Sequence, residues 1–318
     1  MNGPGRLVVA GQMPEDAVRS CLAGLDSVEY RQIGADLSGL EPDVECLVLL
    51  PESFGGTFVA PPSWPGAVQW IQLASSGVDG YPDWLLRNMT VATMHGANAV
   101  AVAELAMATI LAAAKRIPEI WAESVDWPRK GLGDVAGATL GLVGFGAIGA
   151  AVADRAAAFG MDIQATRATD KPFPGAVRRA ASLETLFATS DHVVLALPSS
   201  AATRQLVDAA LLEQAKPGLH LVNVARGDLI DEVALIAALD AKVVSLASLD
   251  VLAVEPPPAD HPLLHHPRAR VSAHVGGNTP QAIGGSMRRL RRNIESFRAG
   301  RPLEGLIDTA MPAGQGSR

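Results

Sequence analysis

The chain has 318 residues and a formal net charge of −7, with 48% hydrophobic and 19% charged residues. This composition excludes a disordered or fibrous protein and predicts about two globular domains, while the acidic balance lacks the basic surface that nucleic acids require. Two cysteines without metal-ligand spacing, no visible secretory signal and no apolar stretch that could span a bilayer of about 30 Å predict a cytoplasmic protein with no nucleic-acid or membrane partner.

Short apolar runs alternate with helix-like segments through most of the chain. Continuous apolar strands separated by helices are typical of a parallel sheet that is covered on both faces. An early pair of strands and a later, denser group are separated by a long helical pattern at residues 99–117, and a final helix is expected at 279–298. The sequence therefore predicts an α/β protein with two doubly wound parallel-sheet domains. The expected strands are residues 7–10, 45–50, 139–146, 192–198, 220–225 and 243–251.

A glycine-rich loop follows the first strand of the denser group and opens a helix. In this context Gly144 permits a tight turn, Gly146 lets the backbone approach a pyrophosphate, and Gly149 allows close packing of helix and strand. The alternative is a glycine-rich turn that binds nothing. The expected dinucleotide contacts are Gly144, Gly146, Ala147, Ile148 and Gly149.

The kind of dinucleotide is predicted from Thr166 and Arg167, which follow the next strand. An acidic residue near this position accepts hydrogen bonds from the ribose 2′-hydroxyl of NAD and would repel a 2′-phosphate. A guanidinium instead forms charge-assisted hydrogen bonds to a phosphate, and Lys171 could add positive charge. We therefore expect NADP(H) to be preferred. NAD(H) is possible if Arg167 is only a solvated charge or stacks on the adenine.

Three isolated polar residues, Arg226, Glu255 and His274, lie next to the ends of later strands. The carboxyl ends of parallel strands face the ligand crevice, so these residues can converge there although they are far apart in sequence. Reduction of a 2-oxo acid needs a cation for its carboxylate, an acid that donates a proton as hydride arrives, and a partner that keeps that acid protonated. Arg226, His274 and Glu255 supply these groups respectively. The alternatives are an ion pair of Arg226 with Asp228 or Asp231, and a merely structural proline-rich turn at Glu255.

Four of the seven histidines lie between His261 and His274. His261, His265 and His266 lie among prolines in an expected loop, with no cysteine nearby and no helix that would bring two of them to one face. We therefore expect no metal site.

Several ordered motifs run through nearly the whole length: SSGVDG, VAELAMATILA, TLGLVGFGAIG, LALPSSAATRQLV, NVARGDLID, LDVLAVEP and AHVGGNTPQA. Together they resemble the D-isomer-specific 2-hydroxyacid dehydrogenases, and Arg167 resembles the NADP-preferring glyoxylate/hydroxypyruvate reductase branch. The resemblance implies a Rossmann cofactor domain, residues 99–277, inserted into a flavodoxin-like substrate-binding domain, residues 1–98 and 278–318, with a cleft between them. It also implies hydride transfer between NADP(H) and a small 2-oxo or 2-hydroxy acid such as glyoxylate or hydroxypyruvate, and we expect a homodimer.

The same resemblance implies roles for individual residues. His274 would be the catalytic acid/base, Arg226 the substrate-binding arginine and Glu255 the partner of the histidine. The other expected substrate contacts are Ser76, Gly77, Val78 and Asn98, and the other expected cofactor contacts are Pro198, Thr203, Ala225, Asp250 and Gly277.

The sequence departs from the family pattern at two positions. Leu252 stands where an aromatic residue is common, and Ala273 stands where a proline commonly precedes the histidine. These changes leave the chemistry intact but alter the shape of the pocket. A protein of another class, a dinucleotide sensor similar to the C-terminal-binding corepressors, keeps the same three polar residues and is the alternative function. A phosphoglycerate-type enzyme would need a cationic residue near Ser76, and the sequence has none there.

Overall fold

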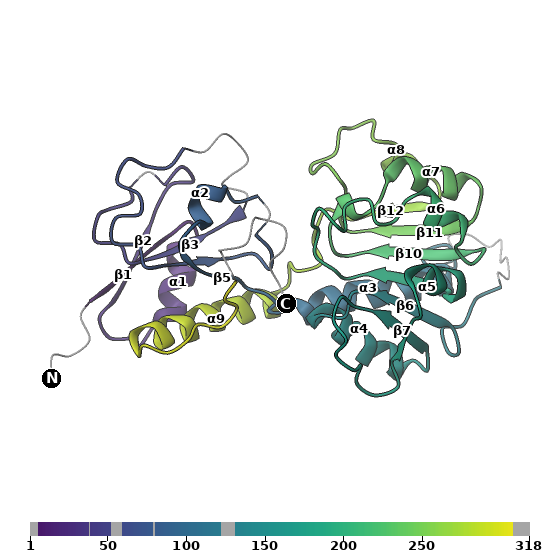
Figure 1. The fold of residues 1–318 in the computed structure, drawn as a ribbon, viewed down its shortest axis with the longest axis horizontal. Helices are drawn as coiled ribbons and strands as arrows, with labels where there is room; N and C mark the ends of the chain where they lie inside the picture. Colours follow the sequence, from purple (N-terminus) through teal and green to yellow (C-terminus); the bar gives the residue numbers. More distant parts are fainter. Residues whose placement is uncertain (1–5, 38, 52–58, 79, 122–130, 308–318) are drawn as a thin grey trace. The chain divides into compact units, whose positions relative to one another are not determined.

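The computed structural model describes residues 6–37, 39–51, 59–78, 80–121 and 131–307. The chain forms two compact units: the first contains the residues up to Asn98 and those from Pro280 onward, and the second contains Ala99–Thr279. The chain therefore passes from one unit to the other twice, each time at the start of a helix (Figure 1). Within the described ranges, no helix combines the length and the apolar character that crossing a membrane requires.

The first unit is built on a five-stranded sheet in which all neighbouring strands are parallel. Its strand order, β2-β1-β3-β4-β5, is the doubly wound order of flavodoxin-like folds. The strands are β1 Leu7–Gly11, β2 Val28–Gln32, β3 Cys46–Leu49, β4 Trp70–Leu73 and β5 Thr90–Ala92, and the helices are α1 Glu15–Leu22, α2 Asp83–Leu86 and α9 Pro280–Arg298.

Alternate residues of these strands are buried on opposite faces of the sheet. In β1, Val8 and Ala10 belong to the core that includes the leucines of α2, whereas Leu7 and Val9 belong to the core that includes residues of α1 and α9. Figure 1 shows α1 and α9 on the same side of this sheet. Because both faces are covered, the central strands β1 and β3 are apolar at successive positions, as the sequence indicated.

Buried amides fix α9 and the segment after it to the first sheet. The side-chain amide of Asn293 donates to Gln72 Oε1 over 2.7 Å, and both side chains are fully buried. The N–H of Glu304 donates to Asn293 Oδ1 over 2.8 Å, and the N–H of Thr93 donates to the carbonyl of Gly305 over 2.9 Å. Residues near the end of the described chain thus complete a unit that begins at β1.

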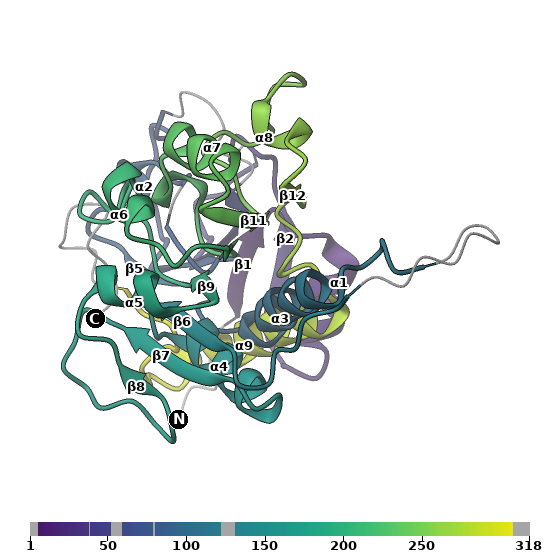
Figure 2. The ribbon, with the colours of Figure 1, turned by 90° about the vertical axis from the view of Figure 1, so that its right-hand side faces the viewer.

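The second unit contains a seven-stranded parallel sheet with the order β12-β11-β10-β9-β6-β7-β8. The strand order reverses between β6 and β9, as in a Rossmann fold, and β8 lies at the edge beside β7 (Figure 2). The expected α/β class with two parallel sheets is confirmed. The strands are β6 Thr139–Val143, β7 Asp162–Thr166, β8 Arg178–Arg179, β9 His192–Leu195, β10 Leu219–Asn223, β11 Val244–Leu249 and β12 Ala269–Val271, and the helices are α3 Ala99–Lys115, α4 Ala147–Ala158, α5 Leu183–Thr189, α6 Ala209–Glu213, α7 Glu232–Asp240 and α8 Pro262–His265.

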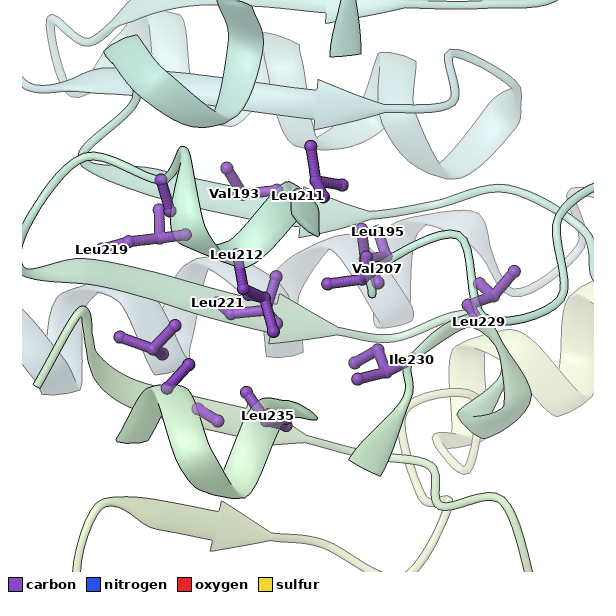
Figure 3. Close-up of a cluster of buried hydrophobic side chains, with 14 of the residues drawn as sticks. Val193, Leu195, Val207, Leu211, Leu212, Leu219, Leu221, Leu229, Ile230 and Leu235 are labelled. Carbon is purple, nitrogen blue, oxygen red and sulfur yellow. The ribbon is translucent and has the colours of Figure 1, made fainter. Parts of the chain in front are cut away.

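Two cores cover the faces of the second sheet. On one face, Leu221 of β10 packs in a cluster with Leu212 of α6 and Leu235 of α7 (Figure 3). On the other face, Ile110 of α3 and Val152 of α4 belong to a separate cluster. Because both faces of the sheet are covered by apolar cores, the polar residues of the site lie in the loops after the carboxyl ends of the strands.

Two histidines form a buried polar contact at the start of β9 and β10. The Nδ1 atoms of His192 and His220, which are paired in register, lie 3.1 Å apart, and Nε2 of His220 lies 2.9 Å from Ser248 Oγ. Burial lowers the pKa of His220 to about 3, with a smaller effect of the neighbouring His192, and burial also lowers the pKa of His192. Both rings are therefore neutral in the folded chain at pH 7, so that one Nδ1 can donate to the other.

Candidate active site

The glycine-rich loop lies at the carboxyl end of β6, where the strand order reverses. Gly144 has a φ of 94°, and a Cβ there would lie 2.5 Å from the carbonyl oxygen of Ala196. A Cβ on Gly149 would lie 2.5 Å from the carbonyl oxygen of Gly144. The packing of the protein itself therefore requires glycine at both positions. A Cβ on Gly146, in contrast, would meet nothing within 4 Å, so the space beside this residue is open to a ligand.

Helix α4 begins directly after this open position. Ala147 and Ile148 lie in its first turn, and no side chain caps the helix at Gly146. Uncapped N–H groups at a helix start, next to open space, suit an anionic group such as a pyrophosphate. The residues present thus fit a bound dinucleotide.

Arg167 is held beside the same loop. The N–H of Gly144 donates to the carbonyl oxygen of Thr166, the last residue of β7, over 3.1 Å. The Cζ atom of Arg167 lies 5.2 Å from the ring centre of Phe145 and 4.5 Å from that of Phe173. The predicted specificity residue is therefore attached to the predicted pyrophosphate loop through an aromatic stack.

The other predicted cofactor contacts of the second unit follow the carboxyl ends of their strands. Pro198 and Thr203 share the turn after β9, where Thr203 Oγ1 donates to the carbonyl of Pro198 over 3.0 Å. Ala225 is buried just after β10, and Gly277 is partly buried between β12 and α9.

Arg226 lies in a turn that the buried Asn223 determines. The side-chain amide of Asn223 donates to the carbonyl of Arg226 over 2.8 Å, and its Oδ1 accepts from the N–H of Ala225 over 3.0 Å. Of the two aspartates near it in sequence, Asp228 accepts from Ser199 Oγ, and Asp231 caps α7. Asn223 was not identified from the sequence, because it looks there like any other residue of a strand.

The turn at Arg226 is in direct backbone contact with the loop that carries Glu255. A Cβ on Gly227 would lie 1.9 Å from the carbonyl carbon of Leu252, so only glycine fits. Glu232, at the start of α7, supports the same loop by accepting a hydrogen bond from the N–H of Ala253 over 3.0 Å. The segments that carry Arg226 and Glu255 are therefore packed directly against each other.

Glu255 and His274 form the pair expected from the sequence. Nδ1 of His274 lies 2.7 Å from Glu255 Oε2, and the other carboxylate oxygen accepts from the N–H of Leu252 over 3.0 Å. Because the carboxylate binds Nδ1, the Nε2 atom is the ring nitrogen left for a ligand. The side chain of His274 is 51% exposed, so this nitrogen can be reached.

Asp250 anchors the backbone around His274. Its carboxylate accepts hydrogen bonds from Ser272 Oγ over 2.5 Å, from the N–H of Val275 over 3.0 Å and from the N–H of Gly276 over 2.8 Å, and its carbonyl accepts from the N–H of His274 over 2.8 Å. These bonds hold His274 at a φ of 51°, in the left-handed region. The sequence did not reveal this role.

A cavity of about 310 Å³ lies beside the histidine–glutamate pair. Both departures from the family pattern, Leu252 and Ala273, line it. The remaining lining residues are Glu255, Pro256, Pro257, Leu264, Val271, Ser272 and His274.

The three loop histidines each have a separate partner. His261 Nε2 lies 3.1 Å from Glu232 Oε2, His265 Nε2 lies 2.8 Å from the carbonyl oxygen of Ala259, and His266 Nε2 lies 3.2 Å from a carboxylate oxygen of Asp240. Across the described ranges, no three potential metal-ligating side chains are grouped.

The predicted substrate contacts of the first unit lie after the carboxyl end of β4. Ser76 Oγ donates to Asn98 Oδ1 over 3.2 Å, so these two residues are brought together. Ser75 Oγ donates to the carbonyl of Gly77 over 2.6 Å, and the carbonyl of Val78 accepts from Tyr81. These hydrogen bonds give the loop a defined conformation within its own unit.

Comparisons with known proteins agree with this architecture. The model of the family "D-isomer specific 2-hydroxyacid dehydrogenase, NAD binding domain" matches residues 107–276. A chloroplastic D-3-phosphoglycerate dehydrogenase of Arabidopsis thaliana is 35% identical over 238 residues, which are 69% of this chain and 39% of that protein. A hydroxypyruvate reductase of Thermotoga maritima is 38% identical over 202 residues, or 62% of this chain and 66% of that protein. The crystal structure of a glyoxylate reductase from Paecilomyes thermophila superposes with a TM-score of 0.80 at 27% identity, covering 97% of this chain and all of the other.

Proposed function

Since the chain belongs to the D-isomer specific 2-hydroxyacid dehydrogenases, we propose that it transfers a hydride between NADP(H) and a small 2-oxo or 2-hydroxy acid of the glyoxylate or hydroxypyruvate type. The observation that carries this proposal is the 2.7 Å contact between His274 and Glu255, next to the turn of Arg226. The second unit holds the cofactor, and Ser76, Gly77, Val78 and Asn98 of the first unit are substrate contacts.

Each polar residue has a separate task in the reduction. A bound nicotinamide supplies the hydride. The guanidinium of Arg226 binds the substrate carboxylate through two parallel hydrogen bonds. His274 donates the proton on Nε2 to the carbonyl oxygen, which becomes the hydroxyl of the product, and Glu255 stabilises the imidazolium through Nδ1. In the reverse direction, the neutral ring accepts the same proton.

The nucleotide is held by the residues of the loop and by Arg167. The N–H groups at the start of α4 bind the pyrophosphate, and the open space beside Gly146 allows the close approach. Arg167 binds the 2′-phosphate of NADP(H). The absence of a carboxylate at the end of β7, where Thr166 and Arg167 stand, supports this choice of nucleotide.

Similarity to a hydroxypyruvate reductase and to a glyoxylate reductase supports the substrate class, whereas another relative is a phosphoglycerate dehydrogenase. The test is NADPH and NADH oxidation with glyoxylate, hydroxypyruvate, pyruvate and 3-phosphohydroxypyruvate. We expect the highest kcat/KM with NADPH and one of the first two acids. A preference for the phosphorylated acid would contradict the substrate assignment. Tight NADPH binding without turnover of any acid would contradict the enzymatic function and favour a dinucleotide sensor.

We expect the substitution Arg226→Lys to raise the KM for the 2-oxo acid about 10-fold or more. The reason is that a point charge cannot reproduce the two parallel hydrogen bonds of a guanidinium, and a hydrogen bond to a charged group contributes about 1.5–3 kcal/mol. The matched control is Arg270→Lys. The guanidinium of Arg270 also donates to the carbonyl of the preceding residue, as that of Arg226 does, but Arg270 is an exposed residue of β12. An unchanged KM in Arg226→Lys would remove this residue from substrate binding.

A further inference from the structure

A second arginine shares the aromatic ring on which Arg167 is stacked. The Cζ atom of Arg179, on edge strand β8, lies 4.8 Å from the ring centre of Phe173, and that of Arg167 lies 4.5 Å from the same centre. Phe173 also contacts Phe145 edge to face, with the ring centres 4.9 Å apart. Phe173 therefore holds two guanidinium groups, each within 5 Å of its ring centre. Figure 2 shows β8 beside β7, the strand that ends directly before Arg167.

This cluster is continuous with the dinucleotide loop. Phe145 is the residue between Gly144 and Gly146, and its ring contacts both Phe173 and Arg167. The register of β8 on β7 pairs Arg179 with Ala165, two residues before Arg167. The second guanidinium is thus fixed at the same end of β7 as the predicted phosphate-binding residue.

The two guanidiniums donate to backbone carbonyls instead of carboxylates. The hydrogen-bond acceptors of both guanidiniums are backbone carbonyls: that of Pro172 for Arg167, and those of Thr169 and Lys171 for Arg179. Among the described residues, neither arginine forms an ion pair with a carboxylate, and Nε of Arg167 is buried without a hydrogen-bond partner. Two cations that contact the same ring without an acidic partner raise the local positive potential, and binding of an anion to both would lower it.

A phosphate monoester is the anion that fits this arrangement. It carries nearly two negative charges at pH 7 and several acceptor oxygens, and guanidiniums that are stacked on an aromatic ring keep their planes and donors oriented. We propose that Arg179 is a second specificity residue, which together with Arg167 binds the 2′-phosphate of NADP(H), and that Phe173 holds the two guanidiniums at the correct spacing. This inference rests on the proposed use of NADP(H) and extends it to a residue 12 positions further along the chain.

The test measures the dissociation constants of NADPH, NADH, 2′,5′-ADP and 5′-AMP for the whole protein, by calorimetry. The variants are Arg179→Gln, Arg167→Gln and the double variant. Arg178→Gln is the matched control, because it removes the same charge from the neighbouring residue of β8, whose side chain points to the opposite face of the strand. We expect Arg179→Gln to weaken NADPH and 2′,5′-ADP about 10-fold or more, with NADH and 5′-AMP changed less than about twofold, and Arg178→Gln to change the NADPH/NADH ratio by less than about twofold.

The ratio of the two dinucleotides distinguishes phosphate binding from a structural role. Arg179 also donates to the carbonyls of Thr169 and Lys171, so a purely structural role would weaken NADPH and NADH alike or leave both unchanged. Either result for Arg179→Gln overturns the inference for Arg179. If Arg167→Gln still removes the preference for NADPH, the proposed cofactor is not affected. If the natural chain binds NADH as tightly as NADPH, both the inference and the proposed cofactor are wrong.

Discussion

The variant His274→Ala is expected to reduce a 2-oxo acid about 10²–10⁴ times more slowly than the natural chain, with NADPH affinity unchanged. The methyl group of alanine cannot donate the proton that the carbonyl oxygen receives, and the hydrogen bond with Glu255 is lost. The glycine loop and Arg167, which bind the nucleotide in our proposal, are not altered. The measurements are kcat by NADPH oxidation under saturating acid, and the dissociation constant of NADPH.

The backbone conformation at His274 calls for a second variant. With a φ of 51°, this residue lies in the left-handed region, which alanine adopts less readily than asparagine. His274→Asn should therefore keep the local fold and show the same loss of turnover. His265→Ala is the control, because His265 is exposed and contacts a backbone carbonyl instead of a carboxylate. Turnover that stays unchanged in both His274 variants would exclude this residue as the proton donor.

The second large effect is a loss of stability in mild acid, caused by the buried contact between His192 and His220. Both rings are neutral in the folded chain, and burial lowers the pKa of His220 to about 3 and also lowers that of His192. In the unfolded chain each histidine titrates near pH 6.5. Below this pH the unfolded state therefore binds protons that the folded state does not, so the free energy of unfolding decreases as the pH falls from about 6.5 towards 3.

The expected size of this effect makes it measurable. For His220 alone, the free energy of unfolding should fall by about 2 kcal/mol between pH 6.5 and pH 5, and by on the order of 4 kcal/mol at pH 3.5 and below. This is a large part of the usual 5–15 kcal/mol. Urea unfolding at pH 8, 7, 6 and 5 gives the slope, in a range where most carboxylates stay ionised. The double variant His192→Asn/His220→Asn should show a flatter slope, whatever its absolute stability, and His265→Asn should not. A flat profile of the natural chain over this range would contradict the prediction.

The central strands of the second unit could be predicted from the sequence because they are buried on both faces. Residues such as Val193 to Leu195 of β9 form an uninterrupted apolar run, which indicates a buried strand. Edge strands such as β2 and β8 escaped prediction, since β2 has Glu29 and Arg31 among its residues and β8 consists of Arg178 and Arg179. In the first unit, β4 contains the buried Gln72, whose partner Asn293 lies 221 residues later. In the sequence, a short segment with a polar residue indicates a loop, because the distant partner of the polar side chain cannot be recognised.

The candidate site could likewise be predicted from the sequence only in part. Glu255 and His274 could be placed together in advance, because both follow strands of one parallel sheet and their chemistry is complementary. The supporting contacts could not be predicted. The backbone contact of Gly227 with Leu252 and the stacking of Arg179 on Phe173 depend on how two loops pack, and no local pattern encodes that packing.

The order in which the chain is synthesised has a consequence for the first unit. Its sheet needs Asn293 against Gln72 and the backbone of Gly305 against Thr93, so a ribosome must release nearly all of the described residues before this unit can close. All strands and helices of the second unit are made earlier, within Ala99–Thr279. During translation we therefore expect the inserted unit to acquire protease resistance first. The β-strands that are synthesised earliest stay unpaired with α9 and the segment after it until the end of translation, and they need protection from aggregation during that time.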